Sequence, residues 1–162
     1  MKNRCSYALT VLAFSLLAGL GSAALTDTQD IMAGLAPQYT IDSAPGDITS
    51  WNLTLGNNLL YPGAGTVRSN VPWKVQVNEA GGDGQMSSES VPGHKLGSSI
   101  VAKCGPTNAT VTVTMTGTPQ TIWTGAAGSD WPNVRYEQYV VASDKPHDDY
   151  WIVLTYTISA AT

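Results

Sequence analysis

Few side chains in this sequence could do chemistry, and the histidines come first. His94 and His147 are the only two, and they lie in separate turn-rich segments without the His-x-x-x-His spacing of a helical zinc site. No serine lies in a Gly-x-Ser-x-Gly turn, which would expose a nucleophile. The glutamates Glu79, Glu89 and Glu137 form no evident pair of the kind that glycoside hydrolysis needs. We therefore expect no catalytic site and no enzyme.

Aspartates crowd one predicted turn. Asp144, Asp148 and Asp149 lie close together in the chain and could supply several of the about six to eight oxygens that calcium takes. Their spacing does not match an EF-hand loop, and aspartate also favours turns for purely local reasons. We keep calcium at these three residues as the only cofactor candidate, with an ordinary turn as the alternative.

The N-terminus has the three parts of a secretory signal peptide. Two basic residues precede an apolar run, and the small residues 21–24 follow it. The run is shorter than the ~20 residues of a spanning helix. We expect cleavage after Ala23 or Ala24, which removes 1–24 and leaves 25–162 as a secreted chain, extracellular or in the cell envelope, with no membrane span.

Signal cleavage would leave Cys104 as the only cysteine. In an oxidising compartment an odd cysteine suggests a disulfide between chains or a free thiol. Cys104 precedes a Gly-Pro turn signal, which favours exposure. The alternative is a buried, inert cysteine at the end of a strand. The sequence leaves both interpretations open, and Cys104 is our candidate for an intermolecular disulfide.

Tryptophans and asparagines add candidate surface sites. Trp131 precedes a proline in a turn, where an exposed ring could stack on a sugar. Trp73 and Trp151 alternate in phase with aliphatic residues, so we assign them to the core. Asn52 and Asn108 each begin an Asn-x-Thr sequon and are glycosylation candidates; the first falls in a predicted strand and the second at a turn.

The composition excludes several classes of protein. The 162-residue chain is 43% hydrophobic and 12% charged, the opposite of a disordered chain. It has 8 Lys and Arg against 12 Asp and Glu, and signal cleavage would remove two of the basic residues. An acidic chain of this kind is unsuited to nucleic acid, so we expect no nucleic-acid partner.

Strands must position these side chains, because β-branched residues alternate along most of the chain. Val111, Val113 and Met115 alternate with threonines, the strongest strand pattern present. Residues 150–159 carry apolar side chains on both faces, which indicates a central strand. The predicted strands are 38–42, 48–55, 65–69, 73–78, 99–103, 109–116, 120–124, 134–142 and 150–159.

The spacing of strands and turns indicates the fold class. Gly, Pro and Asn turn signals separate the short strands, whereas the Gly- and Ser-rich residues 79–98 predict a long surface loop or a mobile hairpin. This pattern predicts an all-β fold: a single immunoglobulin-like or jelly-roll-type β-sandwich of about seven to nine strands.

Three segments together resemble a known group of proteins: 47–53, 68–77 and 149–160. They are similar to the small secreted β-sandwich proteins of methanogenic archaea, found at cell surfaces and in sheath-like envelopes. More distantly, the chain resembles bacterial WxL surface domains and TasA-like matrix-fibre subunits. Trp51-Asn52-Leu53 matches the Trp-x-Leu triplet, whereas the segment beginning at Trp151 departs from it. The resemblance implies a non-catalytic structural subunit and assigns no active-site residues.

The residues themselves suggest how such a subunit would assemble. Unpaired strand edges recruit further strands through main-chain hydrogen bonds, and residues 25–42 could form an edge strand or donate one to a neighbour. We therefore expect a homopolymer in a sheath, surface layer or fibre, in contact with other envelope components and open to cross-linking at Cys104. The alternative is a secreted carbohydrate-binding or adhesive module that uses Trp131 and the acidic loop near Asp148.

Overall fold

The computed structural model describes residues 32–106 and 111–161, and all of its regular structure is β-strand. Contacts divide the chain into Met1–Gly34 and Leu35–Thr162, and the strands belong to the second unit. The predicted signal peptide and Asn108 lie outside the described residues. Within the described ranges, no helix has the length and apolar character needed to cross a membrane.

The described residues of the second unit form twelve strands. They are β1 (Tyr39–Ser43), β2 (Gly56–Ala64), β3 (Thr66–Ser69), β4 (Trp73–Glu79), β5 (Gln85–Ser88), β6 (Lys95–Ser99), β7 (Val101–Cys104), β8 (Val111–Thr114), β9 (Gln120–Gly125), β10 (Asn133–Val140), β11 (Tyr150–Trp151) and β12 (Leu154–Ala160). All pairings are antiparallel, in sheets of order β2-β10-β7-β8, β12-β4-β9, β11-β5-β6 and β1-β3.

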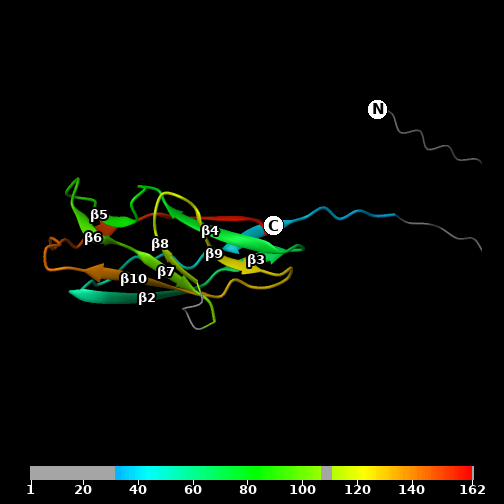
Figure 1. Ribbon diagram of the computed structural model, residues 1–162, viewed down its shortest axis with the longest axis horizontal. Helices are drawn as coiled ribbons and strands as arrows, with labels where there is room; N and C mark the ends of the chain where they lie inside the picture. Colours follow the sequence, from blue (N-terminus) through cyan, green and yellow to red (C-terminus); the bar gives the residue numbers. More distant parts are fainter. Residues whose placement is uncertain (1–31, 107–110, 162) are drawn as a thin grey trace, which may run out of the picture. The chain divides into compact units, whose positions relative to one another are not determined.

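The sheets form a β-sandwich, which confirms the predicted fold class. One layer is β2-β10-β7-β8. The other layer is β12-β4-β9, and the sheet β11-β5-β6 extends it. The two sheets are continuous because β4 is followed along the chain by β5, and β11 is followed by β12. Figure 1 shows β2, β10 and β7 on one side, with β4 and β5 across from them. The strand count exceeds the expected seven to nine because long strands are interrupted and residues 79–98 contribute two more.

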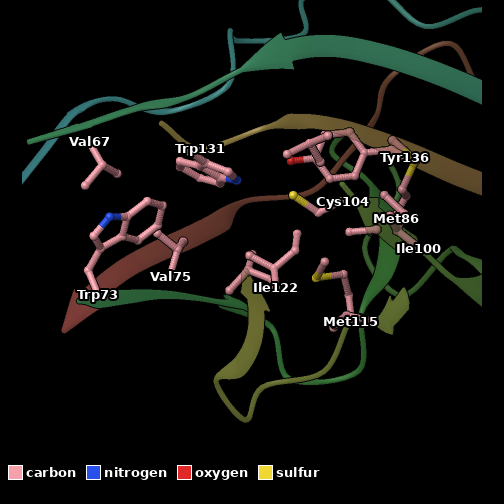
Figure 2. Close-up of a cluster of buried hydrophobic side chains, with 14 of the residues drawn as sticks. Val67, Trp73, Val75, Met86, Ile100, Cys104, Met115, Ile122, Trp131 and Tyr136 are labelled. Carbon is pink, nitrogen blue, oxygen red and sulfur yellow. The ribbon is translucent and has the colours of Figure 1, made fainter. Parts of the chain in front are cut away.

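The core fills the space between the layers. Trp73, Val75 and Val77 alternate inward from β4 and are fully buried, as the period-two pattern predicts. Figure 2 shows Val75 on one side of the core, with Cys104 and Tyr136 on the other. Each buried valine adds about 1.5–3 kcal/mol to the free energy of unfolding relative to an exposed one. The inward face of β4 is therefore a main source of the stability of the sandwich.

The strand predicted at 48–55 is wrong. Residues 44–55 form no strand, and β2 begins only at Gly56. The Asn58 side chain explains this, because it accepts from Thr54 N at 2.8 Å and donates to the Thr54 carbonyl oxygen at 2.7 Å. Gly56 turns the chain with a φ of 96°. Local side-chain hydrogen bonds thus replace a sheet ladder here.

Residues 79–98 take the hairpin alternative and are not a long surface loop. β5 and β6 pair with each other, and β5 also pairs with β11. Met86 and Leu96 are buried between the layers. The Glu79 carboxylate holds the turn before β5 by accepting the N–H groups of Gly81, Gly82 and Gly84. The hairpin is therefore part of the sandwich.

The strand predicted at 150–159 is interrupted and is not central. It divides into β11 and β12, and among the described strands β12 pairs with β4 alone, at the edge of its sheet. Its outward face is open, since Trp151 is 50% and Val153 is 46% exposed. Assigning Trp151 to the core was therefore wrong, and its ring is available at the surface.

Candidate functional site

The site lies where two loops meet at one end of the sandwich. The first loop joins β5 to β6, and the second joins β10 to β11. Asp149 links them, because its carboxylate accepts from Ser88 Oγ at 2.9 Å and from Ser90 N at 2.5 Å. These hydrogen bonds, those from Ser90 above all, lower the pKa of Asp149 to about 2. The carboxylate therefore stays ionised and holds the loops together over nearly the whole pH range.

A second carboxylate makes a similar clamp. Asp144 accepts from Gly97 N of β6 at 2.8 Å and from Val141 N at 2.9 Å. The first bond ties the β10–β11 loop to the hairpin, and the second closes the loop on itself. With Asp149, this contact fixes the backbone on both sides of the histidines.

The two histidines face each other across these loops. His94 Nδ1 lies 2.8 Å from His147 Nε2, and Lys145 Nζ lies 3.1 Å from His94 Nε2. An ammonium group can only donate, so His94 accepts at Nε2 and carries its proton on Nδ1, which donates to His147. Burial lowers the pKa of His94, and the charge of Lys145 and electrostatic repulsion with protonated His147 lower it further; together they favour the neutral form of His94.

Tyr150 packs against the histidine pair and binds the loop beside it. Its ring packs edge-on against His147, with centroids 5.6 Å apart, and its hydroxyl donates to the Lys145 carbonyl oxygen at 2.8 Å. Burial, and then the negative charges of Asp144 and Asp149, raise the pKa of Tyr150. The phenol therefore stays protonated and keeps its hydrogen bond to the loop.

A groove of about 740 Å³ opens beside the histidine pair. One wall is the extended segment 45–53, the other is residues 147–152, and buried core side chains such as Met86 form the floor. Trp51 and Trp151 line it, together with the carboxylates of residues 47, 89 and 148. An aromatic-lined groove with polar groups is suited to binding a ligand that has both apolar faces and hydroxyls.

A separate surface feature is the outer edge of β2. This strand pairs with β10 on one side and has no strand partner on the other among the described residues. It contains no charged residue, and it exposes Leu59 (44%) and Tyr61 (56%). Leu55, just before the strand, is 71% exposed. Edges usually carry a charge or a bulge that blocks further pairing; here only Pro62 and the bulge near it interrupt the edge.

The structure places Cys104 in the core. Its side chain is fully buried, with Sγ 3.8 Å from the Pro132 carbonyl oxygen, and burial raises the pKa of the thiol. A disulfide between chains needs an accessible sulfur. The intermolecular-disulfide candidate is therefore not supported, and the buried, inert cysteine that the sequence left open matches the geometry.

Trp131 is also buried, contrary to its assignment as an exposed sugar-stacking ring. It is 1% exposed and packs edge-on against Tyr156, with centroids 5.0 Å apart. Gly65 makes room for it, because a Cβ at Gly65 would collide with the indole ring. Rings that could stack on a sugar are instead those of Trp51 and Trp151 at the groove.

The remaining candidates fall in different places. Asp144 and Asp149 hold backbone N–H groups, while Asp148 is exposed. In the parts of the chain that the structure describes, no three His, Cys, Asp or Glu side chains are placed to hold one metal ion, so calcium remains a prediction. Asn52 is exposed and outside any strand, which leaves its sequon accessible.

Sequence reasoning missed the histidine pair and the aromatic groove. Fifty-three positions separate His94 from His147, and no spacing rule connects two such loops. One sequence pattern could have indicated the groove, because Trp151 alternates with Val153 and threonines on the outward face of its predicted strand. The Ser88 hydroxyl donates to Asp149, and among the described residues no hydrogen bond joins a serine hydroxyl to either imidazole, so Ser88 and the histidines are not arranged as a nucleophile and its base.

No protein-family model matches this chain, and no curated protein is significantly similar to it. The case for a function therefore rests on the geometry of the β2 edge, the groove and the histidine pair.

Proposed function

We propose that this protein is a non-catalytic structural subunit of a cell envelope, secreted and joined to copies of itself through the free edge of β2. The observation that carries the proposal is this nine-residue edge strand with exposed Leu59 and Tyr61 and no charged residue. Backbone N–H and C=O groups along such an edge favour addition of another strand. A second copy offers a strand of matching character.

Two copies of β2 would pair antiparallel about a twofold axis. Residues 57–61 provide the main-chain hydrogen bonds, because Pro62 lacks an N–H and Gly63 has a φ of 102°. The contact is self-complementary, with Leu59 of one copy near Tyr61 of the other. The absence of charge in β2 means that no like-charge pair opposes the contact.

The sheet surface beside β2 is also compatible with a second copy. Glu137 on β10 lies opposite Leu59 and is paired with Arg135 at 2.5 Å and with Lys103 at 2.9 Å. Because these charges satisfy one another, the surface next to the edge does not repel an identical surface strongly. Tyr139, which is 54% exposed, extends the apolar area.

A polymer, as opposed to a dimer, needs a second contact. The stretch 35–43 is a candidate, in keeping with the strand that residues 25–42 were expected to donate. β1 pairs with β3 of its own chain, yet Tyr39 is 41% and Leu35 is 78% exposed. Assembly does not need Cys104, so the proposal contains no covalent cross-link. A sheath, a surface layer and a fibre all fit this arrangement, with other envelope components as neighbours.

Sedimentation velocity tests the proposal. The protein should sediment faster as its concentration rises, and Leu59→Lys should weaken self-association at least about tenfold by placing a charge at the edge. Thr112→Lys, on the exposed face of β8, is the matched control and should behave as wild type. A protein that stays monomeric at all concentrations, or a Leu59→Lys variant that associates normally, contradicts the proposal.

The groove supports a second candidate, a carbohydrate-binding module. Trp51 and Trp151 could stack on sugar rings while nearby carboxylates accept hydroxyl hydrogen bonds. Binding of envelope oligosaccharides should then fall about tenfold or more in Trp151→Ala. Tyr139→Ala, an exposed aromatic outside the groove, should bind normally. Equal binding by both variants argues against this candidate.

A further inference from the structure

We propose that His94 and His147 together bind one divalent transition-metal ion, of the class Zn²⁺, Ni²⁺ or Cu²⁺. The two facing nitrogens, His94 Nδ1 and His147 Nε2, are 2.8 Å apart. Two nitrogens that each bind an ion at about 2.0–2.1 Å lie roughly 2.9 Å apart at a right angle and about 3.3 Å apart in a tetrahedron. Rotation of both imidazoles, which turns each nitrogen lone pair away from the other ring and toward a shared ion, therefore converts the hydrogen-bonded pair into a chelate.

The backbone around the pair is already fixed. Asp149 ties the β10–β11 loop to Ser88 and Ser90, while Asp144 ties it to Gly97. These bonds hold the segments that carry His94 and His147 together without help from the imidazoles. A preorganised site loses little entropy when it binds an ion, so the chelate forms without folding of the loops.

The protons balance without an additional reactant. Imidazole binds metals in its neutral form, and each ring needs a lone pair facing the ion. His147 already presents one at Nε2, whereas His94 must move its proton from Nδ1 to Nε2 through solvent. That step ends the hydrogen bond from Lys145, whose exposed side chain can turn into solvent. Lys145 is thus the group that competes with the ion.

The surrounding charges favour a cation. The carboxylates of Asp144 and Asp149 lie on the same loop, and Asp148 is exposed beside His147 at the groove. Because the described residues offer no group of three ligating side chains, water takes the remaining coordination positions. The site is therefore a two-histidine chelate with open coordination positions.

Titration of the purified protein with zinc chloride, followed by calorimetry, tests the proposal. The protein must lack a polyhistidine tag, since its own two histidines are then the only imidazoles present. We expect one ion per chain, with affinity reduced about tenfold or more in His94→Gln and in His147→Gln. Lys145→Ala should bind several-fold more tightly, and Lys95→Ala, which removes an exposed lysine of β6 that is paired with Asp83, should match wild type.

Imidazole ¹⁵N NMR of the wild-type protein gives a readout that needs no variant. Zinc should shift His94 Nδ1 and His147 Nε2, and both shifts should disappear in acid, because protons compete with the ion for the imidazole nitrogens. Absence of zinc binding at neutral pH, or binding that persists unchanged in both glutamine variants, overturns the proposal. Neither result bears on assembly at β2, which has its own measurement.

Discussion

At the scale of single residues, Gly84 occupies a position that other residues cannot adopt without strain. Its φ is 72°, and a Cβ there would collide with the Met115 carbonyl group. Its own carbonyl oxygen accepts from Ile100 N at 2.8 Å, so the backbone has little freedom to move away. The turn before β5 therefore depends on this glycine for both its conformation and its close approach.

We predict that Gly84→Ala lowers the free energy of unfolding by about 3 kcal/mol, from the left-handed backbone plus the collision. Gly128→Ala is a matched control, because Gly128 has a φ of 70° with open space around its Cβ position. It should lose only about 1 kcal/mol. Urea unfolding measures both, and equal losses would show that the Met115 contact is unimportant.

Individual residues also show which burial states the sequence can predict. Period-two alternation correctly predicted that Trp73, Val75 and Val77 are buried, since alternation alone decides which face a strand residue occupies. Trp131 was assigned wrongly because its local context is a turn, while its burial depends on Gly65, a residue distant in sequence. The burial of Cys104 could not be decided from the sequence for the same reason, because neighbouring residues in the chain do not determine which distant residues pack against a side chain.

At the scale of elements, the error at 48–55 and the success at β4 have related causes. A hydrophobic segment becomes a strand only where a neighbouring strand offers its backbone. The hydrogen bonds of Asn58 redirect the chain before it can pair, and no propensity scale includes such a contact. The β5–β6 hairpin shows the converse, because Ser88 pairs with Tyr150 despite a weak strand sequence.

The two loops at the histidine pair should respond to acid through Asp149. Its pKa is lowered to about 2 in the folded protein, against an ordinary value of 3.8. A lowered acid pKa stabilises the fold fully above the ordinary value, and this contribution disappears as the pH falls through about 2. The stabilisation that Asp149 gives the fold should therefore be complete at pH 4 and decline between about pH 4 and pH 2, whereas the contact itself should be lost only as the pH falls through about 2.

Amide hydrogen exchange at Ser90 measures this contact directly. We predict slow exchange of the Ser90 N–H in the wild-type protein at pH 4 and faster exchange, by about tenfold, in Asp149→Asn, whose neutral amide accepts more weakly. Asp148→Asn changes an exposed neighbour and should leave the Ser90 amide protected. Fast exchange in the wild-type protein, or equal exchange in both variants, contradicts the role given to Asp149.

At the scale of the whole molecule, composition predicted the fold class well and the binding surfaces poorly. An all-β sandwich follows from many short alternating segments separated by turn residues. Which edge stays free depends on sheet order, and order is set by pairings between distant segments such as β2 with β10. The groove and the histidine pair likewise exist only after the loops are brought together.

Charge and the β2 edge together predict how assembly depends on salt. The chain has a formal net charge of −4, so identical copies repel one another, whereas β2 contributes no ion pair to hold them together. Salt screens the repulsion and leaves a contact of main-chain hydrogen bonds and apolar side chains intact. Raising sodium chloride from low to high concentration should therefore strengthen self-association several-fold in sedimentation experiments. Association that weakens with salt would mean that opposite charges join the copies, and the contact would then have to lie away from β2.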